Sequence, residues 1–221
     1  MDFNFLSKTI LFRGIAPQDI QSLMGCLNAT TKKYKKDEFI LYSGKSTSFM
    51  GIVLSGSVSI ENDDIWGNRS ILDLIGPGQV FAENYACIPG EPLMINAVAG
   101  ESTEILFLST QSMFSVCANT CVFHSKLIQN MLLLSAQKSL NLSRRILHTS
   151  SKTIRGRLLS YLSYQATCHG SKSFEIPFNR QQLADYLNVD RSTMSNELSK
   201  MQRDGIIKLN RNHFTLLNTD S

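Results

Sequence analysis

Proline and glycine are absent from the whole stretch between Ser109 and Arg155, which limits the possible folds more than any other feature of the sequence. Apolar residues in this stretch fall mostly at helical spacings. They are Leu127, Ile128, Met131, Leu132, Leu134, Ala136, Leu140 and Leu142. The pattern predicts a long helix that begins near residues 121–125. Because positions 131–134 point around most of a turn, one neighbouring surface cannot cover them. A second copy of the helix would cover the rest in a two-fold dimer; a helix sandwiched between two domains of one chain is the alternative.

Short apolar runs separated by turn residues precede this helix. The runs are residues 39–42, 51–54, 58–60, 71–75, 80–81, 95–98 and 105–108, with turn signals at 43–44, 55–56, 66–68, 76–78 and 89–90. Such regular punctuation predicts a β-sandwich or jelly-roll barrel. The segment 15–27 has apolar residues on one helical face after Pro17, and we expect this helix to pack on the barrel.

The part that follows the long helix has a different character. The polar, small-residue-rich stretch 144–152 predicts a hinge, and helices are predicted at 154–165, 180–187 and 191–203. Strands at 206–209 and 214–217 then indicate a short hairpin. The predicted fold class is α+β, with a jelly-roll sensor domain at 1–120, a dimerisation helix and hinge at 121–148, and a winged helix-turn-helix domain at 149–221.

The charges are divided unequally along the chain. The chain has 22 basic and 18 acidic side chains. Residues 1–137 contain 9 basic and 12 acidic ones, which gives a net charge of −3. Residues 138–221 contain 13 basic and 6 acidic ones, which gives a net charge of +7. This asymmetry indicates that the C-terminal part contacts a polyanion. A hydrophobic content of 43% excludes a disordered chain.

Residues 178–201 carry the most specific local signals. Asn179 and Gln182 have the spacing of a capping box, Asn188 occupies a turn that needs a positive φ, and Asp190 can cap the next helix. The apolar side of that helix contains Met194, Leu198 and Met201, and its exposed side contains Arg191, Ser192, Ser195, Asn196 and Lys200. The two helices predict a helix-turn-helix with the hairpin as its wing. A merely solvated helix face is disfavoured, because the caps, the turn, the wing and the positive charge agree.

Cysteine usage and hydropathy give expectations about location and redox chemistry. No apolar run is long enough to span a membrane and residues 1–5 do not resemble a signal peptide, so we expect a cytoplasmic protein without a membrane partner. The five cysteines are scattered without a C-x-x-C pair, which argues against a disulfide framework or a four-thiolate metal site. Cys117 and Cys121, four residues apart, are interpreted as buried apolar residues, with a thiol-responsive regulator as the alternative.

The chain resembles the Crp/Fnr superfamily of bacterial transcription regulators along nearly its whole length. The resemblance rests on Gly44, residues 54–58 (Leu-Ser-Gly-Ser-Val), 76–83 (Gly-Pro-Gly-Gln-Val-Phe-Ala-Glu), 155–159 (Arg-Gly-Arg-Leu-Leu) and the helix-turn-helix ending at 204–207 (Asp-Gly-Ile-Ile). It implies a homodimer that senses a small signal in a cyclic-nucleotide-binding-like barrel and binds a palindromic operator in double-stranded DNA. It also implies RNA polymerase as a partner. A signalling module that uses the barrel to bind another protein is a further alternative, disfavoured by the positive segment and the intact helix-turn-helix.

The phosphate-binding cassette departs from this resemblance. Members that bind cyclic nucleotides have F-G-E followed after about ten residues by R-S/T-A, in which the arginine pairs with the cyclic phosphate. This chain has Phe81-Ala82-Glu83, and Leu93 and Met94 stand at the positions of the arginine and the serine. Without the guanidinium the strongest phosphate contact is lost, so we predict that cyclic AMP does not bind tightly.

Other effectors and catalytic roles are also disfavoured. Residues 1–25 lack the cysteines of an iron–sulfur regulator, and the histidines at 124, 148, 169 and 213 all lie beyond the barrel. No metal site of a haem or metal sensor or of a cupin-type enzyme is therefore predicted, nor any catalytic residue or cofactor. The predicted effector pocket consists of Phe81, Glu83, Asn84, Leu93, Met94 and Asn96, with Arg145 or Lys138 reaching in. It would suit a carboxylate or an aromatic organic acid, unless these side chains simply fill the barrel.

The resemblance also assigns DNA contacts, though not the operator sequence or whether the output is activation or repression. The base-reading residues are Arg191, Ser192, Ser195 and Asn196, and the phosphate-contacting residues are Arg155, Thr193, Lys200, Arg211 and His213. Many members have glutamate at the position of Ser192 and a guanine-reading arginine at that of Asn196. Because asparagine prefers adenine, we expect a different base at this point of the half-site.

Overall fold

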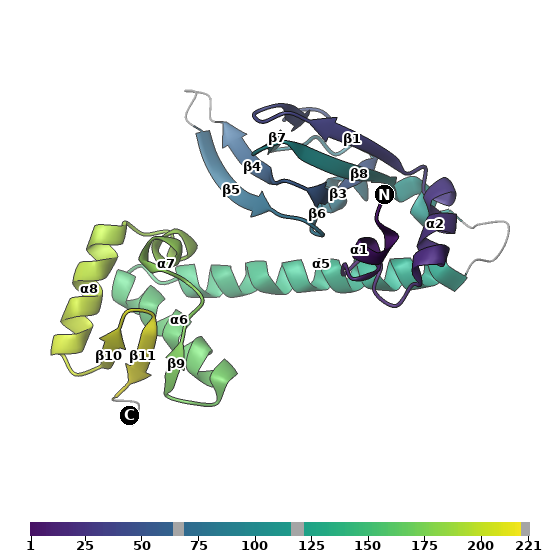
Figure 1. Cartoon of the computed structure of the whole chain (residues 1–221). Coiled ribbons are helices and arrows are strands. Elements are labelled where there is room, and N and C mark those ends of the chain that lie inside the picture. The colour runs from purple at the N-terminus through teal and green to yellow at the C-terminus, as the bar shows by residue number, and fades with distance from the viewer. Residues whose placement is uncertain (64–68, 116–121, 218–221) are drawn as a thin grey trace. The chain divides into compact units, whose positions relative to one another are not determined.

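The computed structural model describes residues 1–63, 69–115 and 122–217 (Figure 1). Contacts divide the chain into two compact units, residues 1–136 and 137–221. The first unit contains α1 (Phe3–Ser7), α2 (Pro17–Cys26), β1 (Thr30–Tyr34), β2 (Phe39–Leu41), β3 (Phe49–Ser55), β4 (Val58–Asp63), β5 (Arg69–Ile75), β6 (Val80–Phe81), α3 (Glu83–Ala86), β7 (Asn96–Ala99), β8 (Thr103–Ser109) and α4 (Thr110–Phe114). Helix α5 (Val122–Thr149) begins in this unit and ends in the second one.

Two four-stranded antiparallel sheets form the first unit. Their strand orders are β1-β8-β3-β6 and β2-β7-β4-β5. The cluster buried between them is Ile40, Val53, Val58, Ile75, Phe81, Ala97, Ala99, Ile105 and Phe107. The predicted sandwich is confirmed. Each predicted apolar run corresponds to one of its strands. Strand β1 was not predicted, because its sequence Thr-Thr-Lys-Lys-Tyr is polar and it becomes a strand by pairing with β8 at the edge of the first sheet.

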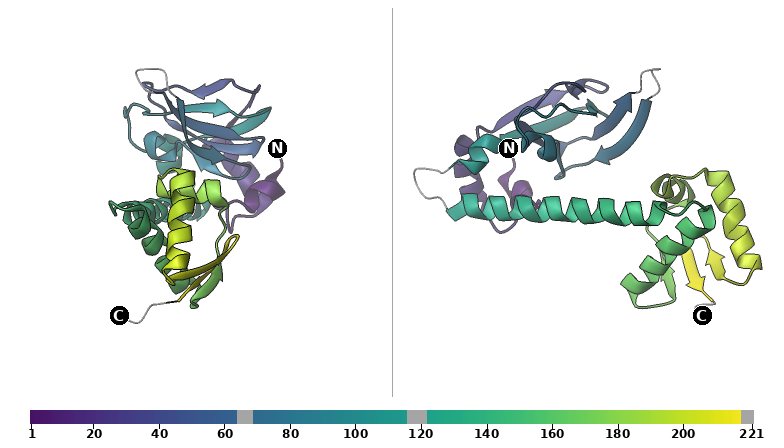
Figure 2. Two further views of the ribbon diagram at one scale, coloured as in Figure 1. Left: turned by 90° about the vertical axis from the view of Figure 1, so that its left-hand side faces the viewer. Right: turned by 180° about the vertical axis from the view of Figure 1, so that it is seen from behind.

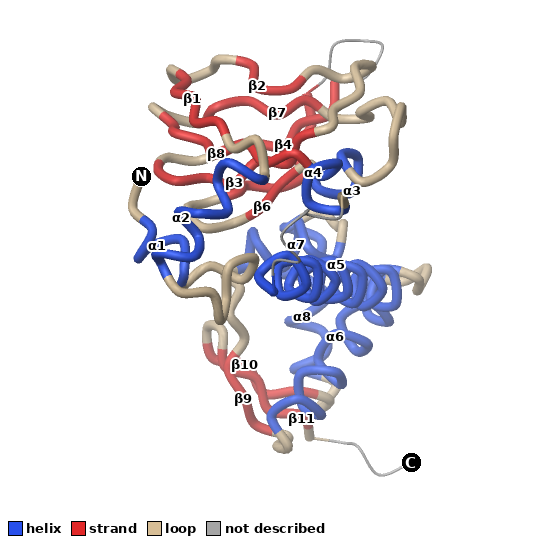
Figure 3. The backbone as a smooth tube through the Cα atoms, turned by 90° about the vertical axis from the view of Figure 1, so that its right-hand side faces the viewer, coloured by secondary structure: helices blue, strands red, loops and turns tan. Residues whose placement is uncertain are grey.

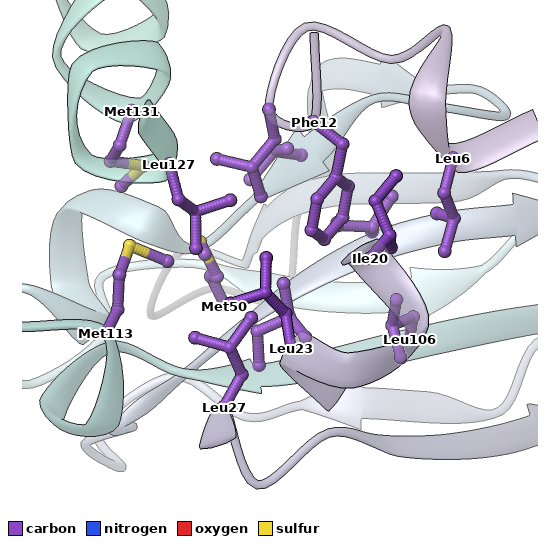
Figure 4. Close-up of a cluster of buried hydrophobic side chains, with 14 of the residues drawn as sticks. Leu6, Phe12, Ile20, Leu23, Leu27, Met50, Leu106, Met113, Leu127 and Met131 are labelled. Carbon is purple, nitrogen blue, oxygen red and sulfur yellow. The ribbon is translucent and has the colours of Figure 1, made fainter. Parts of the chain in front are cut away.

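Helices cover the other face of the first sheet (Figure 4). Met50 and Leu106 project from this face and are fully buried against Leu23 of α2 and Leu127 of α5 in one apolar cluster. Asn130 of α5 is buried and donates from Nδ2 to the backbone carbonyls of Leu11 (2.9 Å) and Arg13 (2.8 Å). The first half of α5 is therefore anchored to this unit by both apolar packing and satisfied polar contacts.

Most of the predicted hinge, residues 144–152, is helical in the structure. Helix α5 runs without interruption through Thr149 (Figure 2), and the chain leaves the helical conformation only at 150–153. The small polar residues stay compatible with the helix because their hydroxyls bond back to it: Thr149 Oγ1 donates to the Arg145 carbonyl at 2.8 Å. Polarity alone does not end a helix that contains no glycine or proline.

The second unit contains the end of α5 together with α6 (Ile154–His169), β9 (Ser173–Glu175), α7 (Arg180–Leu187), α8 (Arg191–Arg203), β10 (Ile207–Asn210) and β11 (His213–Leu216). Its strands form a small antiparallel sheet in the order β10-β11-β9 (Figure 3). Strand β9 was not predicted, and its Phe174 pairs in register with Phe214 of β11. The buried core is Leu158, Tyr161, Leu162, Phe174, Ile176, Leu183, Ala184, Leu187, Met194, Leu198, Met201, Ile207, Phe214 and Leu216.

The last turn of α5 is packed into this second unit through His148. The imidazole is completely buried, its Nδ1 lies 3.1 Å from Ser160 Oγ, and three tyrosine rings surround it. The ring centroids of Tyr161, Tyr164 and Tyr186 lie 5.6, 5.3 and 6.1 Å from that of the imidazole. Burial disfavours the charged imidazolium and so lowers the pKa of His148.

Candidate nucleic-acid interface and effector pocket

Helix α7 begins and ends with the local structures that its sequence predicts. The Asn179 side chain accepts from the Gln182 N–H, and the Gln182 side chain accepts from the Asn179 N–H, both at 2.9 Å. At its other end Asn188 adopts the left-handed conformation (φ 52°, ψ 57°) that reverses the chain toward α8. Ala184 is completely buried between these ends, where α7 contacts the rest of the unit's core.

The N-terminus of α8 is held by a single carboxylate. Asp190 accepts hydrogen bonds from the Ser192 hydroxyl (2.5 Å) and from the N–H and hydroxyl of Thr193 (2.8 Å each). These bonds stabilise the ionised form and lower the pKa of Asp190 to about 2. The Ser192 and Thr193 hydroxyl protons thus point at Asp190, so toward DNA these two groups offer oxygen lone pairs rather than donors.

The outer face of α8 presents the predicted base-reading positions. Met194, Leu198 and Met201 are buried on the inner side of the helix, and Arg191 and Asn196 are exposed. Ser195 is half-buried and donates from Oγ to the Arg191 carbonyl at 2.9 Å. The exposed face therefore combines a guanidinium and an amide, the two groups that read guanine and adenine in the major groove.

Among the predicted phosphate-contacting residues, Arg155 has a structural role that its sequence did not reveal. Its guanidinium pairs with Glu197 Oε1 (2.6 Å) and with Asp204 Oδ2 (2.7 Å), and these hydrogen-bonded ion pairs raise the pKa of Arg155. Arg155 thus links α6 to the middle of α8 at Glu197 and to its C-cap at Asp204. Because the guanidinium already has two carboxylate partners, the geometry does not support a phosphate contact. Lys200 stays exposed, with Nζ 3.9 Å from Glu197 Oε2.

The turn of the wing lies beside the start of α7. Arg211 occupies this turn with a φ of 55° and is exposed, and His213 Nε2 lies 2.9 Å from Ser173 Oγ. Arg180, which the sequence did not single out, donates from Nη2 to the Arg211 carbonyl at 2.7 Å. A hollow of about 470 Å³ is lined by Pro177, Phe178, Asn179, Arg180, Gln182, Arg211 and Asn212. Arg180 is a further candidate anion contact. The sequence signal for it is an arginine directly after Asn179, the N-cap of α7.

The predicted effector-pocket residues separate into buried and exposed groups. Phe81, Glu83 and Leu93 are each 2% exposed, whereas Met94 is 67% exposed and Asn84 lies in solvent. Phe81 fills space that Gly51 leaves free, because a Cβ at Gly51 would lie 2.3 Å from the Phe81 ring. The interior of the sandwich is thus closed by packing at this point.

The polar and backbone groups of the same pocket hold loops together. Asn96 Oδ1 accepts from the Ser43 N–H at 2.8 Å, and its Nδ2 donates to Asp63 Oδ2 at 3.0 Å. The Leu93 N–H donates to the Lys45 carbonyl, and the Leu93 carbonyl accepts from the Gly44 N–H, both at 2.8 Å. These contacts give Asn96 and the segment around Leu93 a structural function.

Ala82 stands at the position of the cassette glycine and has a left-handed backbone. It has φ 60° and ψ 11°, the left-handed conformation that glycine adopts without strain, and it directly precedes Glu83 at the start of α3. A methyl group therefore stands at a left-handed turn directly before Glu83. This agrees with the absence of an arginine at Leu93.

Arg145 does not have the position expected of a pocket residue. Its Nε donates to the Tyr186 carbonyl and its Nη2 to the Asp185 carbonyl, both at 3.2 Å, and the guanidinium lies 6.0 Å from the Tyr186 ring centroid. A cation at these carbonyls caps the C-terminus of α7. Arg145 is thus engaged within the second unit, and this geometry does not support its assignment to the effector pocket.

Several remaining sequence expectations concern metals, membranes and thiols. Among residues 1–63, 69–115 and 122–217, no group of three or more His, Cys, Asp or Glu side chains could hold a metal ion. Within the same ranges no helix is both long and apolar enough to cross a membrane. Cys117 and Cys121, the basis of the thiol-responsive alternative, lie outside the described residues.

The two units define a class of protein. A cyclic-nucleotide-binding-like sandwich, a long helix and a capped helix-turn-helix with a wing make a non-enzymatic transcription regulator that binds DNA. Residues 31–120 match the cyclic nucleotide-binding domain family, and residues 156–221 match the Crp-like helix-turn-helix domain family. The chain belongs to the Crp/Fnr family.

Known relatives are similar over most of the chain. The transcriptional activator protein FnrL of Cereibacter sphaeroides is 22% identical over 202 residues, covering 80% of this chain and 72% of the relative. The cyclic AMP receptor protein of Thermus thermophilus is 24% identical over 200 residues, covering 90% and 88%. The solved structure of CprK in complex with OCPA has a TM-score of 0.62 and 16% identity, covering 90% of this chain and 92% of that one, and shows the same fold.

Proposed function

We propose that this Crp/Fnr regulator acts as a homodimer that binds a palindromic operator and responds to an effector other than cyclic AMP. The observation that carries the DNA-binding part is the outer face of α8, where Arg191 and Asn196 are exposed on a helix whose start is held by Asp190. The charge division supports it, since the unit that contains α8 carries the net charge of +7. RNA polymerase remains an expected partner.

Asn196 is the residue by which the operator is distinguished from those of many relatives. The Asn196 amide can donate from Nδ2 to adenine N7 and accept at Oδ1 from the adenine N6–H, so each half-site is expected to have adenine at the base it reads. Asn196→Arg should shift the preferred base at that position to guanine. Selection of bound sequences from a random duplex pool measures this, and an unchanged preference would refute the assignment.

A matched control lies on the same helix. Ser199 is exposed and donates from Oγ to the Ser195 carbonyl at 3.0 Å, so its hydroxyl is used within the helix. Ser199→Ala should leave both the selected sequence and the affinity close to those of the parent protein. A shift in base preference with this control would mean that specificity depends on the helix as a whole and not on Asn196.

The proposal excludes tight binding of cyclic AMP. Leu93 is buried where a phosphate-binding arginine would stand, and Ala82 presents a methyl group at the left-handed turn. Neither residue offers the bidentate contact that stabilises a cyclic phosphate in a protein site. Calorimetric titration of the full-length protein should show no binding in the micromolar range. A micromolar dissociation constant would overturn this part of the proposal and leave the DNA-binding part intact.

The dimer is proposed from the exposed side of α5. Large apolar side chains project there and are not covered within the chain: Ile128, Leu132, Leu133, Leu140, Leu142, Ile146 and Leu147, which we call the open stripe. Within the open stripe, Leu133, Leu140 and Leu147 recur every seven residues, the repeat of a two-stranded coiled coil. Ile128 and Leu132, like Leu142 and Ile146, are four residues apart, and serines occupy the intervening positions 135 and 139. A second copy of α5 therefore fits the open stripe, as a two-fold dimer requires.

A further inference from the structure

The sandwich of the first unit has an open side between β1 and β2. Each of these strands lies at the edge of its own sheet, so no further strand in the described part of the chain closes the sandwich between them. A groove of about 500 Å³ lies on this side. Its lining is Asn28, Thr30, Lys32, Tyr34, Ile40, Leu41, Thr47, Phe49 and Phe107. This volume lies in the range of sites for small organic molecules.

Lys32 faces this groove rather than the outside of the sheet. In register, Thr30 pairs with Phe107 and Lys32 pairs with Ile105, and both partners belong to the cluster buried between the two sheets. Because paired residues of neighbouring strands share a face, Lys32 projects toward the inter-sheet side. Its Nζ lies 5.9 Å from the centroid of the Phe107 ring. The next residue, Lys33, projects from the opposite face.

The walls of the groove are aromatic and aliphatic, with polar groups at the strand edges. The Tyr34 and Phe107 rings meet edge to face with their centroids 6.5 Å apart, and Phe49 adds a third ring that is 40% exposed. Thr30 and Thr47 also line the groove, and the Thr47 hydroxyl bonds to the Phe49 backbone. In this described lining the only formal charge is positive, although the unit as a whole carries a net charge of −3.

We propose that this groove is a second small-molecule site, specific for amphipathic carboxylates that carry an aromatic ring. The ring would pack against Phe49, Phe107 and Leu41, and the carboxylate would pair with the Lys32 ammonium. The site is separate from the cassette around Glu83, and it does not depend on the proposed regulatory function. An inward-pointing lysine can also protect an edge strand from pairing with another chain, and that role alone would require no ligand.

The experiment compares three probes on the full-length protein by isothermal titration calorimetry. The probes are 3-phenylpropionate, its neutral analogue 3-phenylpropan-1-ol, and acetate, which has the charge without the ring. We expect 3-phenylpropionate to bind with a dissociation constant below about 1 mM, the alcohol to bind at least about fivefold more weakly, and acetate not to bind. Lys32→Met should weaken the carboxylate at least about fivefold and leave the alcohol within about twofold.

Two further variants make the outcome specific to the groove. Lys33→Met removes the same charge from the opposite face of β1 and should leave all three titrations unchanged. Thr30→Trp fills the groove from an exposed position of β1 and should abolish binding of both aromatic probes. The proposal is overturned if 3-phenylpropionate does not bind, if Lys33→Met weakens it as much as Lys32→Met does, or if Thr30→Trp, shown to be folded by circular dichroism, binds it normally. Lack of binding would leave edge protection as the role of Lys32.

Discussion

Replacing Leu132 tests whether the open stripe of α5 holds two copies of the chain together. The side chain is 70% exposed. Full burial of a leucine side chain contributes about 1.5–3 kcal/mol, so burying the exposed part of two symmetry-related copies contributes about 2–4 kcal/mol. Leu132→Gln keeps the length and helix propensity of the side chain but removes most of this term. The dimer dissociation constant should therefore rise by about 30- to 1,000-fold.

Sedimentation velocity over a dilution series measures this constant directly. Gln137→Ala is the matched control, because Gln137 is an exposed residue of α5 outside the open stripe, and its dimer should dissociate like that of the parent protein. Circular dichroism should show the same helix content in all three proteins. If Leu132→Gln stays dimeric at the same concentrations as the parent, the open stripe is not the dimer interface. If the parent is monomeric at micromolar concentration, the proposed two-fold dimer is refuted.

Three further predictions test individual features of the two units. Burial lowers the pKa of His148 in the folded protein below the unfolded value of about 6.5. Above the unfolded pKa the imidazole is neutral in both states, and the free energy of unfolding has its full value. This free energy decreases as the pH falls from the unfolded pKa through the lower folded pKa, because the unfolded state binds the proton first. The melting temperature should therefore drop less between pH 7.5 and 5 in His148→Gln than in the parent, and equal drops would contradict this. Ala82→Gly should stabilise the first unit by about 0.5–1 kcal/mol in urea unfolding, because it relieves a left-handed alanine, whereas Ala86→Gly in α3 should destabilise it. Arg211→Ala should reduce the salt slope of DNA binding by about one, and Arg155→Ala should leave it unchanged because that guanidinium pairs with Glu197; the reverse order would restore Arg155 as a phosphate contact.

Elements whose ends are determined by neighbouring residues could be predicted to the residue. Helices α7 and α8 have the predicted bounds, because Asn179, Asn188 and Asp190 make their capping bonds within a few positions along the chain. Strands β1 and β9 could not be predicted in this way, since their residues are held by strands far away in the sequence.

The same distinction separates the site predictions. The outer face of α8 follows from helical periodicity, so the exposure of Arg191 and Asn196 could be predicted. The ion pairs of Arg155 with Glu197 and Asp204 join residues more than 40 positions apart, and nothing in the local sequence indicates them. The contacts of Arg145 could not be predicted for a related reason, because its partners are the backbone carbonyls of α7 rather than side chains with a recognisable pattern.

The departures of the cassette from a nucleotide-binding one form a consistent set. A leucine at position 93 cannot pair with a phosphate as an arginine would. The buried side chains of Leu93 and Phe81 instead place apolar atoms in the interior. Gly51 is needed for this packing, since any side chain there would collide with the Phe81 ring. A substitution such as Leu93→Arg would therefore place a charge at a buried position instead of recreating a phosphate site. Cyclic AMP binding should require changes at Ala82, Leu93 and Met94 together, so no single one of these substitutions should produce measurable binding by calorimetry.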